Sequence, residues 1–82
     1  MNADELEARI LNFLRQKLRI REAVERDTEL VSTGLVDSAD LVRLATHLER
    51  TLDVTIPDHE INVDNFDSIA MILAYVERKL GS

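Results

Sequence analysis

Apolar residues recur at helical spacing in three segments of this chain, and this repeat restricts the fold more than any other feature. The three apolar stripes are Leu6, Ile10, Phe13, Leu14 and Leu18; Leu41, Leu44, Ala45, Leu48 and Leu52, broadened by Val42; and Ile69, Ile72, Leu73, Val76 and Leu80. No alternation of apolar and polar residues is long enough to indicate a β-sheet. The pattern therefore predicts an all-α fold, a small four-helix bundle of three main helices and one short helix.

Capping residues and helix breakers set the expected ends of these helices. Asp, Asn and Ser cap helix N-termini, whereas a residue before proline avoids the helical region and glycine suits the end of a helix. The expected helices are 4–18, capped near Asn2 or Ala3; 38–52, capped by Asp37 and ended by the segment leading to Pro57; a short helix within 57–61; and 69–80, with caps offered by residues 65–68 and a stop at Gly81.

A long connection, residues 19–37, joins the first two main helices. Its apolar side chains are Val24, Leu30, Leu35 and Val36. We expect them to fold back onto the core, so the connection is predicted to be a packed loop and not a flexible linker. Within it, Asp27 or Thr28 can cap a short helical turn over residues 27–30.

Length and composition limit the classes of function. A chain of 82 residues makes one domain, 1–82, and the absence of cysteine excludes disulfides and thiolate chemistry. The net charge of −6 disfavours nucleic acid and suggests basic protein partners. No apolar run approaches the roughly 20 residues of a membrane span, and the acidic N-terminus is unlike a secretory signal. We expect a cytoplasmic monomer without membrane insertion.

The segment Gly34-Leu35-Val36-Asp37-Ser38-Ala39-Asp40-Leu41 places a serine hydroxyl where a loop gives way to a helix. Backbone N–H groups and the helix dipole favour a phosphate at such a position. Asp37 and Asp40 flank the hydroxyl, although capping and dipole compensation alone would explain two carboxylates there. Because Asp-Ser is a common pair, the interpretation depends on the combination of motifs.

Together with Ile56-Pro57-Asp58 and Phe66-Asp67-Ser68-Ile69, this segment resembles the attachment site of the acyl carrier protein family, over roughly residues 6–80. The resemblance implies that Ser38 carries 4′-phosphopantetheine from coenzyme A, whose thiol holds an acyl or aminoacyl group as a thioester. In that family the acidic residue before the serine supports the magnesium site of the transferase, which implies cofactor-site roles for Asp37 and Asp40. The implied partners are a phosphopantetheinyl transferase, a cargo-loading ligase or acyltransferase, and downstream acyl-transfer enzymes.

Carriers of this family dock chiefly through the second helix and the loop before it. The residues that this implies for partner binding are Val36, Ala39, Leu41, Arg43, Ile56 and Ile61. Ala39 stands where fatty-acid carriers usually have leucine, and Arg43 stands where they usually have glutamate. The spacing of Gly34 and Asp37 is similar to that of D-alanyl carriers and other specialised carriers, including those of nonribosomal peptide systems. We therefore expect a specialised lipid or secondary-metabolite pathway.

Nothing in the sequence favours an enzyme. His47 lies nine residues after Ser38 on the same expected helix, which is too far for a Ser–His pair. Neither His47 nor His59 has the spacing of a helical zinc site, and both are expected to be exposed. An unmodified helical interaction module that docks through the second helix stays open as an alternative, and Ser38→Ala would distinguish the two.

Three further features leave alternatives open. Leu44, Leu48, Ile56, Ile61, Ile69 and Ile72 are core residues that also mark the region where some carriers sequester acyl chains. Arg15, Lys17, Arg19 and Arg21 could form a patch for a partner, but we expect them to complement the dipole at the end of the first helix. Arg43 and Arg50 either recognise an unusual partner or balance charge.

Overall fold

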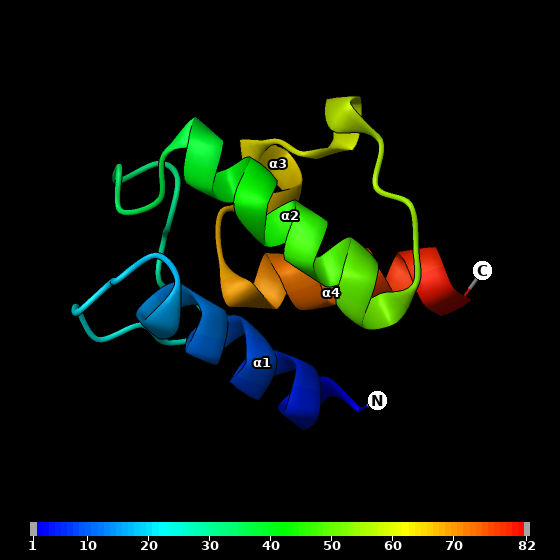
Figure 1. Cartoon of the computed structure of the whole chain (residues 1–82), viewed down its shortest axis with the longest axis horizontal. Helices are drawn as coiled ribbons and strands as arrows, with labels where there is room; N and C mark the ends of the chain where they lie inside the picture. The colour runs from blue at the N-terminus through cyan, green and yellow to red at the C-terminus, as the bar shows by residue number, and fades with distance from the viewer. Residues whose placement is uncertain (1, 82) are drawn as a thin grey trace.

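The computed structural model describes residues 2–81, and within them it contains helices and no strand. In chain order these are α1 (Ala3–Gln16), α2 (Ser38–Leu52), the 3-10 helix η1 (Asp58–Glu60), α3 (Val63–Phe66) and α4 (Ile69–Gly81). In Figure 1, α4 passes behind α2, and α1 lies below both. The predicted all-α bundle with three main helices is confirmed.

The core is built from the predicted apolar stripes. Helix α1 packs against α2 and α4, and α3 packs against α4. The completely buried side chains include Ile10, Leu14, Leu44, Leu48, Phe66, Ile69 and Ile72. Burying a side chain of this size contributes about 1.5–3 kcal/mol, so these contacts hold the helices together.

Two predicted stripe members lie outside the core. Val42 is 51% exposed and Leu80 is 53% exposed. Each residue of a helix turns the side chain by about 100°, which carries Val42 away from the buried face that Leu41 and Leu44 share. Leu80 lies in the last turn of α4, next to the final residue of that helix.

Helix α1 starts one residue before the predicted start at residue 4, has the predicted cap, and ends early. The side chain of Asn2 caps it by accepting a hydrogen bond from the N–H of Glu5 at 2.8 Å. The predicted end is Leu18, whereas the helix stops at Gln16. Arg19 adopts a left-handed conformation with φ 60°, which turns the chain out of the helix.

Helix α2 has the predicted limits, with Asp37 as its N-cap. Its end differs in cause from the prediction, because Asp53 is left-handed at φ 54° and stops the helix four residues before Pro57. The N–H of Val54 then donates to the carbonyl of Glu49 at 3.2 Å. A local C-cap, and not the proline, therefore ends α2.

The segment after α2 contains one more short helix than predicted. The expected turn within 57–61 is present as η1. Asn65, a predicted cap of the last helix, lies instead inside α3, whose N-cap Asn62 accepts from its N–H at 3.1 Å. Ser68 does cap α4, since its hydroxyl accepts from the N–H of Met71 at 3.1 Å.

The loop between α1 and α2 is packed, as predicted. Its buried side chains are Ile20, Val24, Leu30 and Val36, with Leu35 partly buried. The predicted helical turn over 27–30 is wrong: the turn forms over 25–28, where the N–H of Thr28 donates to the carbonyl of Glu25 at 3.2 Å and the Thr28 hydroxyl accepts from the N–H of Glu25 at 2.8 Å.

Candidate functional site

Ser38 is the first residue of the 15-residue helix α2, and it is exposed. The side chain of Asp37 accepts a hydrogen bond from the N–H of Asp40 at 2.8 Å, and its carbonyl accepts from the N–H of Leu41 at 2.9 Å. These bonds fix the first turn of α2. The Ser38 hydroxyl is thereby presented to solvent on a rigid helix end.

The loop before Ser38 is shaped by one left-handed glycine and one buried anchor. Gly34 has φ 79°, a conformation that favours glycine, and its N–H donates to the carbonyl of Val31 at 3.0 Å. Val36 is 1% exposed, and its N–H donates to the carbonyl of Leu30 at 2.9 Å. Because Val36 points into the core, the chain that follows is directed outward at Asp37 and Ser38.

The electrostatics of this helix end suit a phosphodiester on the serine. Among the described residues, the N–H groups of Ser38 and Ala39 have no hydrogen-bond partner, so they remain available to an anion. Asp40 is drawn toward Arg43 by an ion pair of 3.3 Å. An exposed hydroxyl, two unpaired amides and the helix dipole therefore fit a covalently attached phosphate group.

A buried carboxylate holds the loop that leads to Ser38. Asp67, between α3 and α4, accepts hydrogen bonds from the N–H groups of Val31 and Ser32, each at 2.8 Å, and from the Ser32 hydroxyl. The carbonyl of Asp67 also accepts from the N–H of Leu30 at 2.7 Å. The bonds from Ser32, foremost that of its hydroxyl, lower the pKa of Asp67. Sequence reasoning missed this tie because it joins residues that are 35 positions apart.

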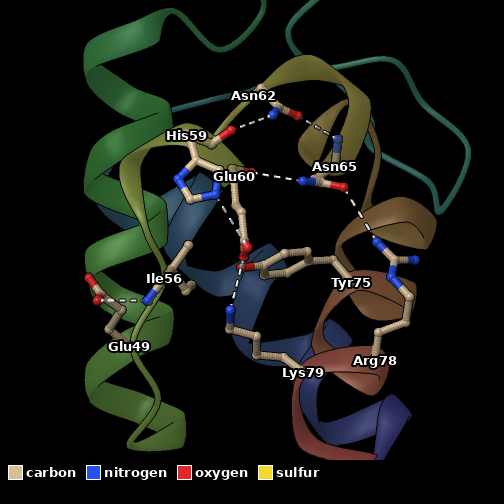
Figure 2. A network of polar contacts seen from close by, with 9 residues as sticks. All are labelled: Glu49, Ile56, His59, Glu60, Asn62, Asn65, Tyr75, Arg78 and Lys79. Atoms are coloured by element: carbon tan, nitrogen blue, oxygen red, sulfur yellow. Dashed lines mark hydrogen bonds and ion pairs between the residues drawn. The ribbon is translucent and has the colours of Figure 1, made fainter. Parts of the chain in front are cut away.

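A second polar network holds the η1 segment against α4, as Figure 2 shows. The Glu60 carboxylate accepts from the Tyr75 hydroxyl and from the Lys79 ammonium at 2.9 Å. The Tyr75 and Lys79 hydrogen bonds lower the pKa of Glu60, while burial and the nearby Glu60 charge raise the pKa of Tyr75 to about 12. On the α2 side, Glu49 accepts from the N–H of Ile56 at 3.0 Å. The segment after α2 is therefore fixed at both ends.

The structure separates the residues that the family resemblance assigns to partner binding. Ala39 and Arg43 are exposed on α2, and Ile61 is half-buried. Val36, Leu41 and Ile56 belong to the core instead, because these apolar side chains point inward from the loop and from the buried face of α2. Sequence reasoning missed the exposed Val42 as a candidate contact, although its position four residues after Ser38 was the available signal.

The two histidines differ in their exposure and contacts. The expectation that His47 is exposed is wrong: it is half-buried and stacks on Phe13 with ring centroids 4.6 Å apart. His59 is exposed as predicted, with its imidazole 3.7 Å from the Glu60 carboxylate. Within residues 2–81, no group of three or more His, Cys, Asp or Glu side chains could hold a metal ion.

The chain matches a known family over most of its length. The family model described as the phosphopantetheine attachment site matches residues 8–76. This range includes Ser38 and the Asp67 tie that holds the loop before it. In addition, none of the described helices is long and apolar enough to cross a membrane.

Proposed function

This chain belongs to the phosphopantetheine attachment-site family, and we propose that Ser38 is the residue whose hydroxyl carries the arm. The family consists of carrier domains with covalently attached 4′-phosphopantetheine. The observation that supports Ser38 is its exposed hydroxyl at the first position of α2, beside two unpaired backbone N–H groups. The arm, once attached, supplies a thiol that holds cargo as a thioester.

Attachment makes Ser38 a nucleophile once, inside a phosphopantetheinyl transferase. Ser38 Oγ forms a bond to the phosphorus of coenzyme A that bears the pantetheine group. The bond from that phosphorus to the adenosine bisphosphate breaks, and the hydroxyl proton passes to a base of the transferase. Asp37 and Asp40 would support the magnesium site of that enzyme, while Asp37 also keeps the helix end capped.

Docking on partner enzymes would use the exposed side of α2 and the η1 segment. Ala39, Arg43 and Ile61 remain from the predicted set, and the exposed Val42 extends it along the helix. Arg43 would repel a partner groove that is built for a dense row of carboxylates, since like charges at close contact are penalised. This supports a specialised carrier of an aminoacyl or unusual acyl group, loaded by a dedicated ligase or acyltransferase.

The test is the intact mass of the apo protein after incubation with coenzyme A, magnesium and a broad-specificity phosphopantetheinyl transferase. We expect a gain of one phosphopantetheine unit in the wild type and none in Ser38→Ala. Thr55→Ala removes another exposed hydroxyl and should load like the wild type. No gain in folded wild-type protein, beside a reference carrier that loads fully, would contradict the proposal and favour an unmodified interaction module.

A further inference from the structure

A groove between α1 and α2 gathers positive charge on a chain whose net charge is −6. It has a volume of about 330 Å³. Its lining includes Phe13 and Lys17 from the α1 side and Val42, Arg43, His47 and Arg50 from α2. The groove therefore combines cations from two helices with the exposed apolar side chain of Val42.

Most of the positive side chains of this groove have no ion-pair partner among the described residues. Among the described residues, the ion pairs include neither Lys17 nor Arg50. Arg43 meets only Asp40, at 3.3 Å, in a pair that is open to solvent and therefore weak. The nearby Glu49 does not line the groove, and its carboxylate accepts from the N–H of Ile56 at 3.0 Å.

The lowered pKa of His47 is consistent with cations from both helices near this groove. Burial lowers its pKa, and the positive charges of Arg9, Lys17 and Arg50 lower it further. Arg9 and Lys17 come from α1 and its C-cap, whereas Arg50 comes from α2. Complementing a helix dipole explains cations in the last turn of a helix, but it does not explain why Lys17 and Arg50, from different helices, line the same groove as His47.

We propose that this groove receives an acidic segment of a partner enzyme, whose carboxylates face Lys17, Arg43 and Arg50 and whose apolar side chain packs on Val42. The inference rests on the proposed function, because it takes α2 as the docking helix. Val42 and Arg50 lie four and twelve residues after Ser38, so they continue along the helix from the attachment site. A partner that reaches Ser38 would therefore extend into the groove. The net charge of −6 suggests basic partners for the chain as a whole, so the acidic contact is confined to this groove, where the cations of α1 and α2 gather.

The test uses two synthetic helical peptides and the isotope-labelled apo protein. One peptide carries leucines on one face with glutamates beside them, and the other carries lysines in place of the glutamates. In an NMR titration, we expect the glutamate peptide to shift the amide signals of Val42 and Arg50 and the lysine peptide to leave them unchanged. Binding should also raise the pKa of His47, since carboxylates would offset the surrounding cations.

Charge-reversal variants locate the binding. K17E/R50E should weaken binding of the glutamate peptide by about tenfold or more. R15E/R21E makes the same change in net charge outside the groove and should bind like the wild type. Because all four side chains are exposed, both variants are expected to keep the wild-type circular dichroism spectrum.

The proposal is overturned if the glutamate peptide does not bind, if both peptides bind equally well, or if K17E/R50E binds like the wild type. It is also overturned if the groove serves a second copy of the chain, seen as self-association that K17E/R50E abolishes. Peptide binding is measured on the apo protein, whereas the proposed function is measured by mass gain. A protein that gains the phosphopantetheine mass but does not bind the glutamate peptide would contradict only the proposed acidic partner.

Discussion

Replacing Asp67 with alanine should lower the free energy of unfolding by about 2–4 kcal/mol. Asp67 is only 7% exposed in the native state, and its side chain accepts three hydrogen bonds from Val31 and Ser32. A hydrogen bond to a charged group contributes about 1.5–3 kcal/mol. The sum is reduced because Ser32 is exposed, so water can replace part of its bonds, and because neighbouring contributions are not additive.

Urea unfolding followed by circular dichroism measures this loss. A domain of this size has a total stability of about 4–12 kcal/mol, so Asp67→Ala should remain folded or marginally folded in the absence of urea. With a slope of about 1–2 kcal/mol per molar urea, the midpoint should fall by at least about 1 M. Asp27→Ala, which removes an exposed carboxylate from the same loop, should change stability by less than about 0.5 kcal/mol.

The pH dependence of unfolding distinguishes the effect of the Asp67 charge from the effect of removing side-chain atoms. The pKa of Asp67 is lowered in the folded state from its ordinary value of 3.8. Its contribution is therefore present above pH 3.8 and is lost as the pH falls through the lowered value. The difference in the free energy of unfolding between the wild type and Asp67→Ala should become smaller in that pH range. A difference in unfolding free energy below about 0.5 kcal/mol at neutral pH, or one that does not change with acid, would show that the Asp67 carboxylate does not stabilise the loop through these bonds.

Three further predictions follow from the core, the second network and the cap. Leu44→Ala should cost about 2–5 kcal/mol in urea unfolding, because Leu44 is completely buried; a cost below about 1 kcal/mol would contradict the packing described above. Tyr75 is the only tyrosine, so the phenolate absorbance of the protein should titrate near a pKa of about 12. In Glu60→Gln it should titrate at a lower pH, because the Glu60 carboxylate raises this pKa. Since the pKa is raised in the folded state, the stability that Tyr75 contributes should be lost as the pH rises above the ordinary value of 10.0. Asp37→Ala should destabilise the domain by about 1 kcal/mol and Asp37→Ser by much less, because serine also caps helices; equal losses would count against capping.

The helices could be predicted from the sequence because their determinants are local. The stripe of Leu41, Leu44 and Leu48 defines one buried face, and Asp37 caps the helix that carries it. The same local signals place Ser38 at the first position of α2. The prediction of Ser38 as the attachment residue depends in addition on the motifs at residues 56–58 and 66–69.

The features that could not be predicted from the sequence depend on contacts between distant segments of the chain. Nothing near Asp67 in the sequence indicates that it binds Val31 and Ser32, so the path of the loop could not be predicted. The outward position of Val42 depends on which face of α2 the other helices cover. The basic groove likewise exists only because α1 brings Lys17 beside Arg50.

Attachment of the arm at Ser38 Oγ can be tested by tandem mass spectrometry of peptides from the wild-type protein after reaction with coenzyme A, magnesium and the transferase. We expect the added phosphopantetheine mass only on fragments that contain Ser38. Finding that mass on a different residue, with the Ser38 fragments unmodified, would exclude Ser38 as the attachment residue.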